Sequence, residues 1–276
     1  EPDEQLQYTI TIENEGEDDS FNLSVTSSSI PEGYTASIIP EQLTIDEDES
    51  ATATLFVKLA PRDHTNSQGG DTHTISFKSE AVNTAGKTKT ALAGITVKNT
   101  YGTTLTAISG EQEVEPNENV KFSMSINNTE GNTPDSITIS YTANGIDNWD
   151  VNPQPSTMTL GVDVTGFFNL SVTPDIEATA GLKSITVLAT SEDGETVSST
   201  SVTVKVKQLP ALQVDKIETS SKDVEAGKRV YYSFSVTNKG NAVDTFSLAV
   251  DTSSLPEGWD ASLDQDTISN LGVDEK

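Results

Sequence analysis

The chain of 276 residues has no cysteine and few basic residues. Without cysteine it forms neither a disulfide nor a thiolate zinc site, and it has no cysteine nucleophile. Its 16 Lys and Arg face 43 Asp and Glu, which gives a formal net charge of -27. No basic patch can neutralise phosphates, so we expect no binding to nucleic acid. Adsorption to an anionic membrane surface is disfavoured for the same reason.

Long hydrophobic runs and convincing helical periodicity are also missing. No stretch reaches the roughly 18 apolar residues of a spanning helix, so we expect no direct membrane insertion of this segment. The chain opens on Glu1 and shows no signal peptide, so it reads as an excised or processed segment.

What the sequence does contain is alternation of apolar and polar residues with period two. This pattern is typical of strands that are buried on one face. It is clearest in three stretches, in which the apolar positions are Leu6, Tyr8, Ile10 and Ile12, then Val120, Phe122, Met124 and Ile126, then Val230, Tyr232, Phe234 and Val236.

The three stretches belong to an internal repeat. Its copies align from Glu1, Glu115 and Glu225, so the spacing is 114 and then 110 residues. Each copy has an alternating strand, a turn that contains Asn and ends on glycine (Gly16, Gly131, Gly240), and a second strand. An aromatic phrase follows, with Tyr34, Trp149 or Trp259. The first two copies continue into a hairpin that turns at "NTAG" and "EDG", both good reversal signals.

Copies of about 110 residues with about seven strands predict an all-β fold of tandem immunoglobulin-like sandwiches. We expect a domain at 1–100 that lacks its first strand, a complete domain at 101–208, and a domain at 209–276 that lacks its last strands. The incomplete domains imply either a longer polypeptide or strands supplied by neighbouring molecules. We expect the aromatic residue of each copy to plug the space between its sheets; the alternative is an exposed ring that grips a sugar.

The repeats resemble the alpha-galactosidase-associated (NPCBM-associated) Ig-like domains and the related cell-adhesion domains of bacterial and archaeal surface proteins. The resemblance rests on the Asn-x-Gly turn (14–16 and 238–240), the strands "DSFNLSV" and "DTFSLAV", the phrases "PEGY" and "PEGW", and the acidic turns "IDEDES" and "LGVDEK". The family often has Pro-Gly-Glu in that turn, where this chain has "DED" and "GVD". The resemblance implies an extracellular spacer, stalk, adhesin or surface-layer module without catalytic residues.

Acid clusters are the better candidates for a metal site, with calcium as the expected ion, because calcium binds six to eight oxygen ligands. The candidate ligands lie in two turns: Glu15, Glu17, Asp18, Asp19, Asp46 and Asp48. The alternative is a pair of solvated, mutually repelling turns. His64 and His73 could in principle hold a metal with Asp63 and Asp71, but we expect a long polar loop between strands instead, since the matching loop of the second copy has no histidine.

Three asparagines are glycosylation acceptors by sequence: Asn22, Asn127 and Asn169. Asn22 and Asn169 each sit between two apolar residues of a strand, so we expect both side chains to point to solvent.

These observations favour a non-catalytic, structural or adhesive rod of an extracellular cell-surface protein: a stalk, surface-layer or filament component. The expected partners are other copies of itself, neighbouring surface proteins or surface glycans, with no cofactor apart from calcium. One alternative is an accessory region of a secreted hydrolase. Another is a filament subunit whose sandwiches are completed by strand donation.

Overall fold

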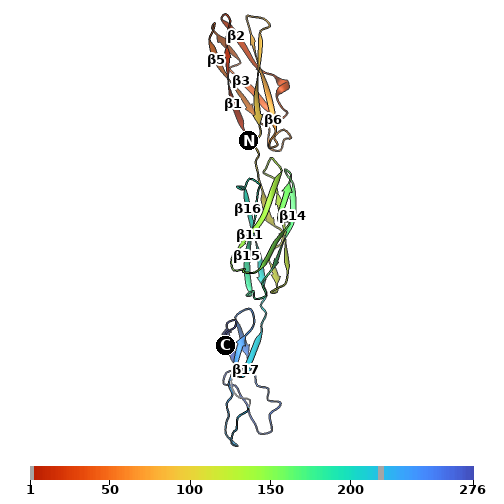
Figure 1. The fold of residues 1–276 in the computed structure, drawn as a ribbon, viewed down its shortest axis with the longest axis vertical. Coiled ribbons are helices and arrows are strands. Elements are labelled where there is room, and N and C mark those ends of the chain that lie inside the picture. Colours follow the sequence, from red (N-terminus) through yellow and green to blue (C-terminus); the bar gives the residue numbers. More distant parts are fainter. Residues whose placement is uncertain (1–2, 217–220) are drawn as a thin grey trace.

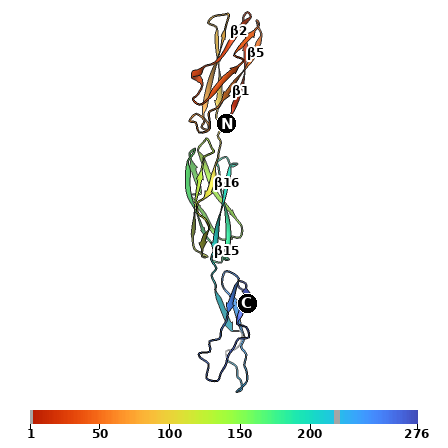
Figure 2. The same ribbon diagram turned by 180° about the vertical axis from the view of Figure 1, so that it is seen from behind.

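The computed structural model describes residues 3–216 and 221–276 as twenty strands and one short 3-10 turn. Three repeats follow one another along the long axis of the molecule, and Figures 1 and 2 show the same order from opposite sides. The all-β, tandem-sandwich prediction is therefore confirmed. In the described ranges no helix is long and apolar enough to cross a membrane.

Repeat 1 packs two antiparallel sheets against each other. The three-stranded sheet has the order β1-β5-β3, formed by β1 (Gln5–Glu13), β5 (Ser50–Lys58) and β3 (Thr35–Ile39). The four-stranded sheet has the order β4-β2-β6-β7, formed by β4 (Gln42–Ile45), β2 (Asp19–Val25), β6 (Thr72–Ala81) and β7 (Thr88–Thr96). The turn η1 (Ser27–Ser29) joins β2 to β3.

Repeat 2 has the same seven strands and two more at its start. One sheet has the order β12-β14-β10-β8, formed by β12 (Asp150–Gln154), β14 (Thr165–Thr173), β10 (Val120–Asn127) and β8 (Thr104–Ala107). The other has the order β13-β11-β15-β16-β9, formed by β13 (Thr157–Leu160), β11 (Asp135–Ala143), β15 (Gly181–Thr190), β16 (Val197–Val206) and β9 (Gln112–Val114). The pair β9 and β16 is parallel.

Two ion pairs flank this parallel pair. Lys205 Nζ lies 2.7 Å from Glu113 Oε2, and Lys207 Nζ lies 3.2 Å from Glu115 Oε1. The backbone N–H of Lys207 also donates to the carbonyl of Val114. The second strand of repeat 2, β9, and its last strand, β16, are thus tied together by side chains as well as by the sheet.

The alternating residues form the core of repeats 1 and 2, as their period predicts. In β10, Phe122, Met124 and Ile126 are all 0% exposed and face the opposite sheet. In β1, Ile10 is buried while Tyr8 and Ile12 pack against the core from its margin. Burial of such side chains stabilises a fold by roughly 25 cal/mol per Å² of apolar surface.

In repeat 3 the predicted strand at 230–236, buried on one face, differs from the structure. β18 (Phe234–Asn238) begins later and pairs with β17 (Leu212–Lys216), while β19 (Asp244–Ser247) pairs with β20 (Thr267–Leu271). Phe234 is 53% exposed, whereas Met124, its counterpart in repeat 2, is fully buried. The face is open because the described residues of repeat 3 include no counterparts of β14, β15 and β16.

Candidate functional site: the joints between repeats

A buried asparagine ends the first long strand of each repeat and holds the turn that follows. Asn14, Asn128 and Asn238 are 5%, 0% and 0% exposed. Each side-chain Nδ2 donates to a backbone carbonyl in its own turn and to one at the end of a neighbouring strand: Glu17 and Ile45, Thr133 and Leu160, Ala242 and Leu271. One amide therefore fastens two loops together at the tip of each repeat.

The acidic turn packs against this asparagine and uses an aspartate in the left-handed conformation. Asp48, Asp163 and Asp274 have φ of 57°, 59° and 59°. Aspartate tolerates this region better than most residues other than glycine. In repeats 2 and 3 the N–H of this aspartate donates to the carbonyl of Asn128 or Asn238, at 2.8 Å in both. This explains how "DED" and "GVD" form a turn without a Pro-Gly pair.

A second asparagine clamps repeat 2 to repeat 1. Asn132 is fully buried, and its Nδ2 donates to the carbonyl of Lys98 in the linker at 2.9 Å. It also donates to the carbonyl of Ser67, in a loop of repeat 1, at 3.2 Å. Its Oδ1 accepts from the N–H of Thr100 at 2.7 Å, and its own carbonyl accepts from the N–H of Gly69 at 2.8 Å. One side chain thus joins three segments.

The joint between repeats 2 and 3 repeats these contacts. Asn241 Nδ2 donates to the carbonyls of Lys207 at 2.8 Å and Ala178 at 3.2 Å. Its Oδ1 accepts from the N–H of Leu209 at 2.7 Å, and its carbonyl accepts from the N–H of Ala180 at 2.9 Å. The equivalent residues Asn132 and Asn241 are 109 positions apart, as are Lys98 and Lys207.

The glycine before each clamp asparagine lets the linker pass close to the turn. A Cβ on Gly131 would lie 3.0 Å from the carbonyl oxygen of Thr100, and one on Gly240 would lie 2.7 Å from that of Leu209. Sequence analysis missed the clamp, although the pair Gly-Asn in both repeats was its signal. Repeat 1 has Gly16-Glu17 at this place and no such asparagine.

The first joint has one further contact, made by Arg62. Its Nη1 donates to the carbonyl of Gly131 at 3.0 Å and lies 3.3 Å from Asp163 Oδ1, both in repeat 2. The contact is partly exposed, so we expect it to stabilise the joint less than the buried Asn132 clamp does.

The acidic residues predicted to bind calcium lie at the tip of repeat 1, at the end of the molecule away from the first joint (Figure 1). Asp18 Oδ1 accepts from the N–H of Glu47, which brings the two acidic turns together. The described residues nevertheless contain no group of three or more His, Cys, Asp or Glu side chains that could hold a metal ion. Calcium at Glu15, Glu17, Asp18, Asp19, Asp46 and Asp48 therefore stays a prediction without a preformed ligand set.

Asp19 instead has a structural role. It is 6% exposed, and its Oδ1 accepts from the N–H groups of Asn83 and Ser20. The hydrogen bond from Asn83 is the main cause that lowers the pKa of Asp19. Asp135 occupies the same place in repeat 2 and accepts from the N–H of Glu192. In both repeats a buried aspartate therefore holds the turn of the last hairpin.

The aromatic residues differ among the three repeats. Tyr34 is buried, donates its hydroxyl to the carbonyl of Asn66, and packs edge-on against His73 at 5.1 Å. Burial raises the pKa of Tyr34. Trp149 packs against the core of repeat 2 from its margin and borders a shallow pocket of about 230 Å³. Trp259 is 62% exposed, so the plug prediction is wrong for it, because the described part of repeat 3 has no counterparts of β14, β15 and β16 to cover the ring.

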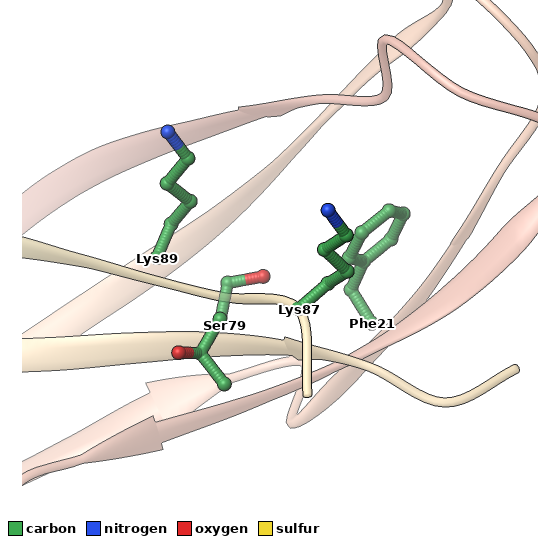
Figure 3. Close-up of a pocket in the computed structure, with 5 residues that line it drawn as sticks. Phe21, Ser79, Lys87 and Lys89 are labelled. Atoms are coloured by element: carbon green, nitrogen blue, oxygen red, sulfur yellow. The ribbon is translucent and has the colours of Figure 1, made fainter. Parts of the chain in front are cut away.

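A second shallow pocket, of about 110 Å³, lies in repeat 1 between β2, β6 and β7. Figure 3 shows Phe21, Ser79, Lys87 and Lys89 around it. Lys89 on β7 pairs with Ser79 on β6, and the equivalent pair in repeat 2 is Ser198 on β16 with Ala189 on β15. Ser198 Oγ accepts from the N–H of Leu105 in β8, a strand with no counterpart among the described residues of repeat 1. The pocket in repeat 1 therefore lies at the position where β8 packs in repeat 2.

The three glycosylation candidates lie in different surroundings. Asn22 and Asn169 are exposed at the middle of strands, as the alternation predicts, while Asn127 is half-buried at the end of β10. Asn22 Oδ1 accepts from Gln42 Nε2 at 2.9 Å, and Asn127 Oδ1 accepts from Thr129 Oγ1 at 3.0 Å.

Neither a scan against protein-family models nor a search of curated proteins finds a match to the chain. Among solved structures it is similar to domains 4 and 5 of the S-layer protein SbsC, with 16% identity and a TM-score of 0.29, over 66% of this chain and 81% of that one. It is similar to the Pseudomonas aeruginosa CupB2 chaperone, with 9% identity and a TM-score of 0.25, over 71% and 91%.

A family 123 glycoside hydrolase from Clostridium perfringens matches with 8% identity and a TM-score of 0.31, over 39% of this chain. The chain covers 27% of that hydrolase. Similarities of this strength do not assign a function.

Proposed function

We propose that the chain is a non-catalytic, stiff rod of Ig-like repeats from an extracellular cell-surface protein, such as a stalk or surface-layer component. The observation that carries the proposal is the repeated joint. Two linkers of different sequence are held by equivalent asparagines, the buried Asn132 and the half-buried Asn241, with the same pattern of hydrogen bonds. A flexible tether needs no such clamp, whereas a spacer that sets a distance does. The resemblance to the alpha-galactosidase-associated domains stays a prediction.

The joint can be tested by X-ray scattering on the chain and on the double variant N132A/N241A. We expect a single extended shape for the unmodified chain and a broader distribution of bent shapes for the variant. The matched control is N169A, because Asn169 is exposed at the middle of β14, away from both ends of repeat 2. A broad distribution in the unmodified chain would contradict the proposal.

A second candidate is a filament subunit whose open repeat 3 is completed by strands of neighbouring molecules. It is favoured by the exposed edges of β18 and β19, each of which has a single partner strand among the described residues. Sedimentation across a range of protein concentrations distinguishes the two candidates, because strand donation requires concentration-dependent assembly.

A further inference from the structure

We infer that Asn169 is the preferred glycosylation site of this chain and that Phe167 is the platform against which the first sugar packs. The inference rests on the extracellular location proposed above. It goes beyond the sequence motif, because the structure separates the three candidates from one another.

The outer face of β14 brings the necessary groups together. Phe167, Asn169 and Ser171 alternate with the buried Phe168 and Leu170, so all three point away from the core. Side chains two positions apart on one strand are about 7 Å apart, which is the reach of a pyranose ring attached to the asparagine. Phe167 is 68% exposed, so its ring is uncovered.

The surroundings of Asn169 leave room for a sugar. Its neighbours on the adjacent strands are Ser123 on β10 and Gln154 on β12, both polar. Ser125 lies opposite Phe167. Ser123 Oγ approaches Asn169 Oδ1 only at 3.4 Å, so the amide is weakly held. A sugar placed here would meet a flat polar sheet with one aromatic ring beside it.

The other two candidates lack this arrangement. The residue two positions before Asn22 is Ser20, and the residue two positions before Asn127 is Ser125. Both amides also make shorter hydrogen bonds than Asn169 does, at 2.9 and 3.0 Å. Asn127 is in addition half-buried and precedes the fully buried Asn128.

The expected modification is an N-linked oligosaccharide that begins with a hexose or N-acetylhexosamine. Asn169 Nδ2 would attack the anomeric carbon of a sugar carried on a lipid pyrophosphate, supplied with its transferase by the secretory pathway. The bond from that carbon to the phosphate oxygen breaks, the lipid pyrophosphate leaves, and one amide proton passes to a base of the transferase. The carbon-hydrogen face of the sugar then packs on the ring of Phe167, since the face of an aromatic ring carries partial negative charge.

The test is to secrete residues 1–276 from a host that attaches N-linked glycans, and to measure the occupancy of each asparagine by peptide mass spectrometry. We expect the peptide with Asn169 to carry the largest glycosylated fraction, and N169Q to lose that mass. If Asn169 is unmodified, or if Asn22 or Asn127 carries the larger fraction, the inference is overturned. Because the host secretes the chain, this result does not depend on where the natural protein resides.

The platform has its own readout. In the glycosylated protein, proton NMR should show the first sugar shifted upfield by the ring of Phe167, and F167T should lose that shift. The matched control is Y141T, because Tyr141 is exposed on the other sheet of repeat 2. If the proton signals of the first sugar are the same in F167T as in the unmodified glycoprotein, the sugar does not pack on Phe167.

Discussion

At the scale of residues, buried amide and carboxylate groups hold this molecule together wherever loops meet. Asn14, Asn128 and Asn238 fasten the tip of each repeat, while Asn132 and Asn241 fasten the joints. All of them except the half-buried Asn241 are buried. Removal of one partner of a buried hydrogen bond costs more than the bond itself contributes, because the other partner stays desolvated.

Asn128 gives the clearest test of this role. N128A leaves the carbonyls of Thr133 and Leu160 without their donor, so we expect the free energy of unfolding of repeat 2 to fall by about 2–3 kcal/mol. The measurement is urea unfolding followed by Trp149 fluorescence in a W259F background, which reports on repeat 2 alone. N144A provides the control, because Asn144 is exposed. An equal fall in the free energy of unfolding in N144A would show that the hydrogen bonds of Asn128 are not what stabilises repeat 2.

Asp19 should make the stability of repeat 1 depend on pH. Its pKa is lowered in the folded state, so its contribution is present above its unfolded pKa and is lost as pH falls through the folded pKa. D19N should therefore unfold at a lower temperature than the unmodified chain at pH 7. The difference in unfolding temperature between D19N and the unmodified chain should narrow as the pH is lowered below about 4. Thermal unfolding of both proteins across that pH range measures it. A gap that does not change with pH would contradict this role of the carboxylate.

At the scale of elements, the strands are what the sequence predicted best. Alternation placed Phe122, Met124 and Ile126 in the core, and it placed Asn22 and Asn169 on the outside. It could not predict the exposure of Phe234 and Trp259, because burial depends on strands that lie far away in the chain. Nor could it predict the clamp, because Asn132 and Asn241 act on a neighbouring repeat rather than on their own.

The open edge of β18 should accept an added strand. In repeat 2, β14 pairs with β10 from Val120 opposite Val172 to Asn127 opposite Thr165. A synthetic peptide with the sequence of residues 165–173 should therefore add antiparallel to β18 and cover Phe234. The measurement is the fluorescence of Trp259 in a W149F background, which we expect to shift to shorter wavelength. A peptide with the same residues in scrambled order is the control, and an equal shift with it would contradict specific pairing.

At the scale of the whole molecule, the charge of -27 is distributed over an elongated shape. Like charges repel in the compact state. Salt at 0.1 M screens the repulsion between exposed charges that are more than about 10 Å apart. The midpoint of urea unfolding should therefore rise when sodium chloride is added to a low-salt buffer, and indifference to salt would count against the expectation. Urea is the suitable denaturant, because guanidinium chloride would itself screen the charges.

The order of the repeats followed from the sequence, because the repeated phrases mark each copy. The sequence also favoured a rod, but it did not predict how each repeat is oriented on the next, since short linkers alone leave that orientation open. The orientation depends on where Ser67 and Ala178 meet the clamp of the next repeat, and those loops differ between the copies.

The parallel pairing of β9 with β16 bears on how repeat 2 responds to tension. The chain runs from the first joint through β8 into β9 and leaves repeat 2 through β16, so a pull on the two ends slides β9 along β16. Under such a load, the hydrogen bonds between Gln112–Val114 and Val204–Val206 are strained together instead of opening one after another. The ion pairs of Glu113 with Lys205 and of Glu115 with Lys207 lie across the same line of sliding. Repeat 2 is therefore built to resist stretching along the rod more strongly than its thermal stability alone would suggest.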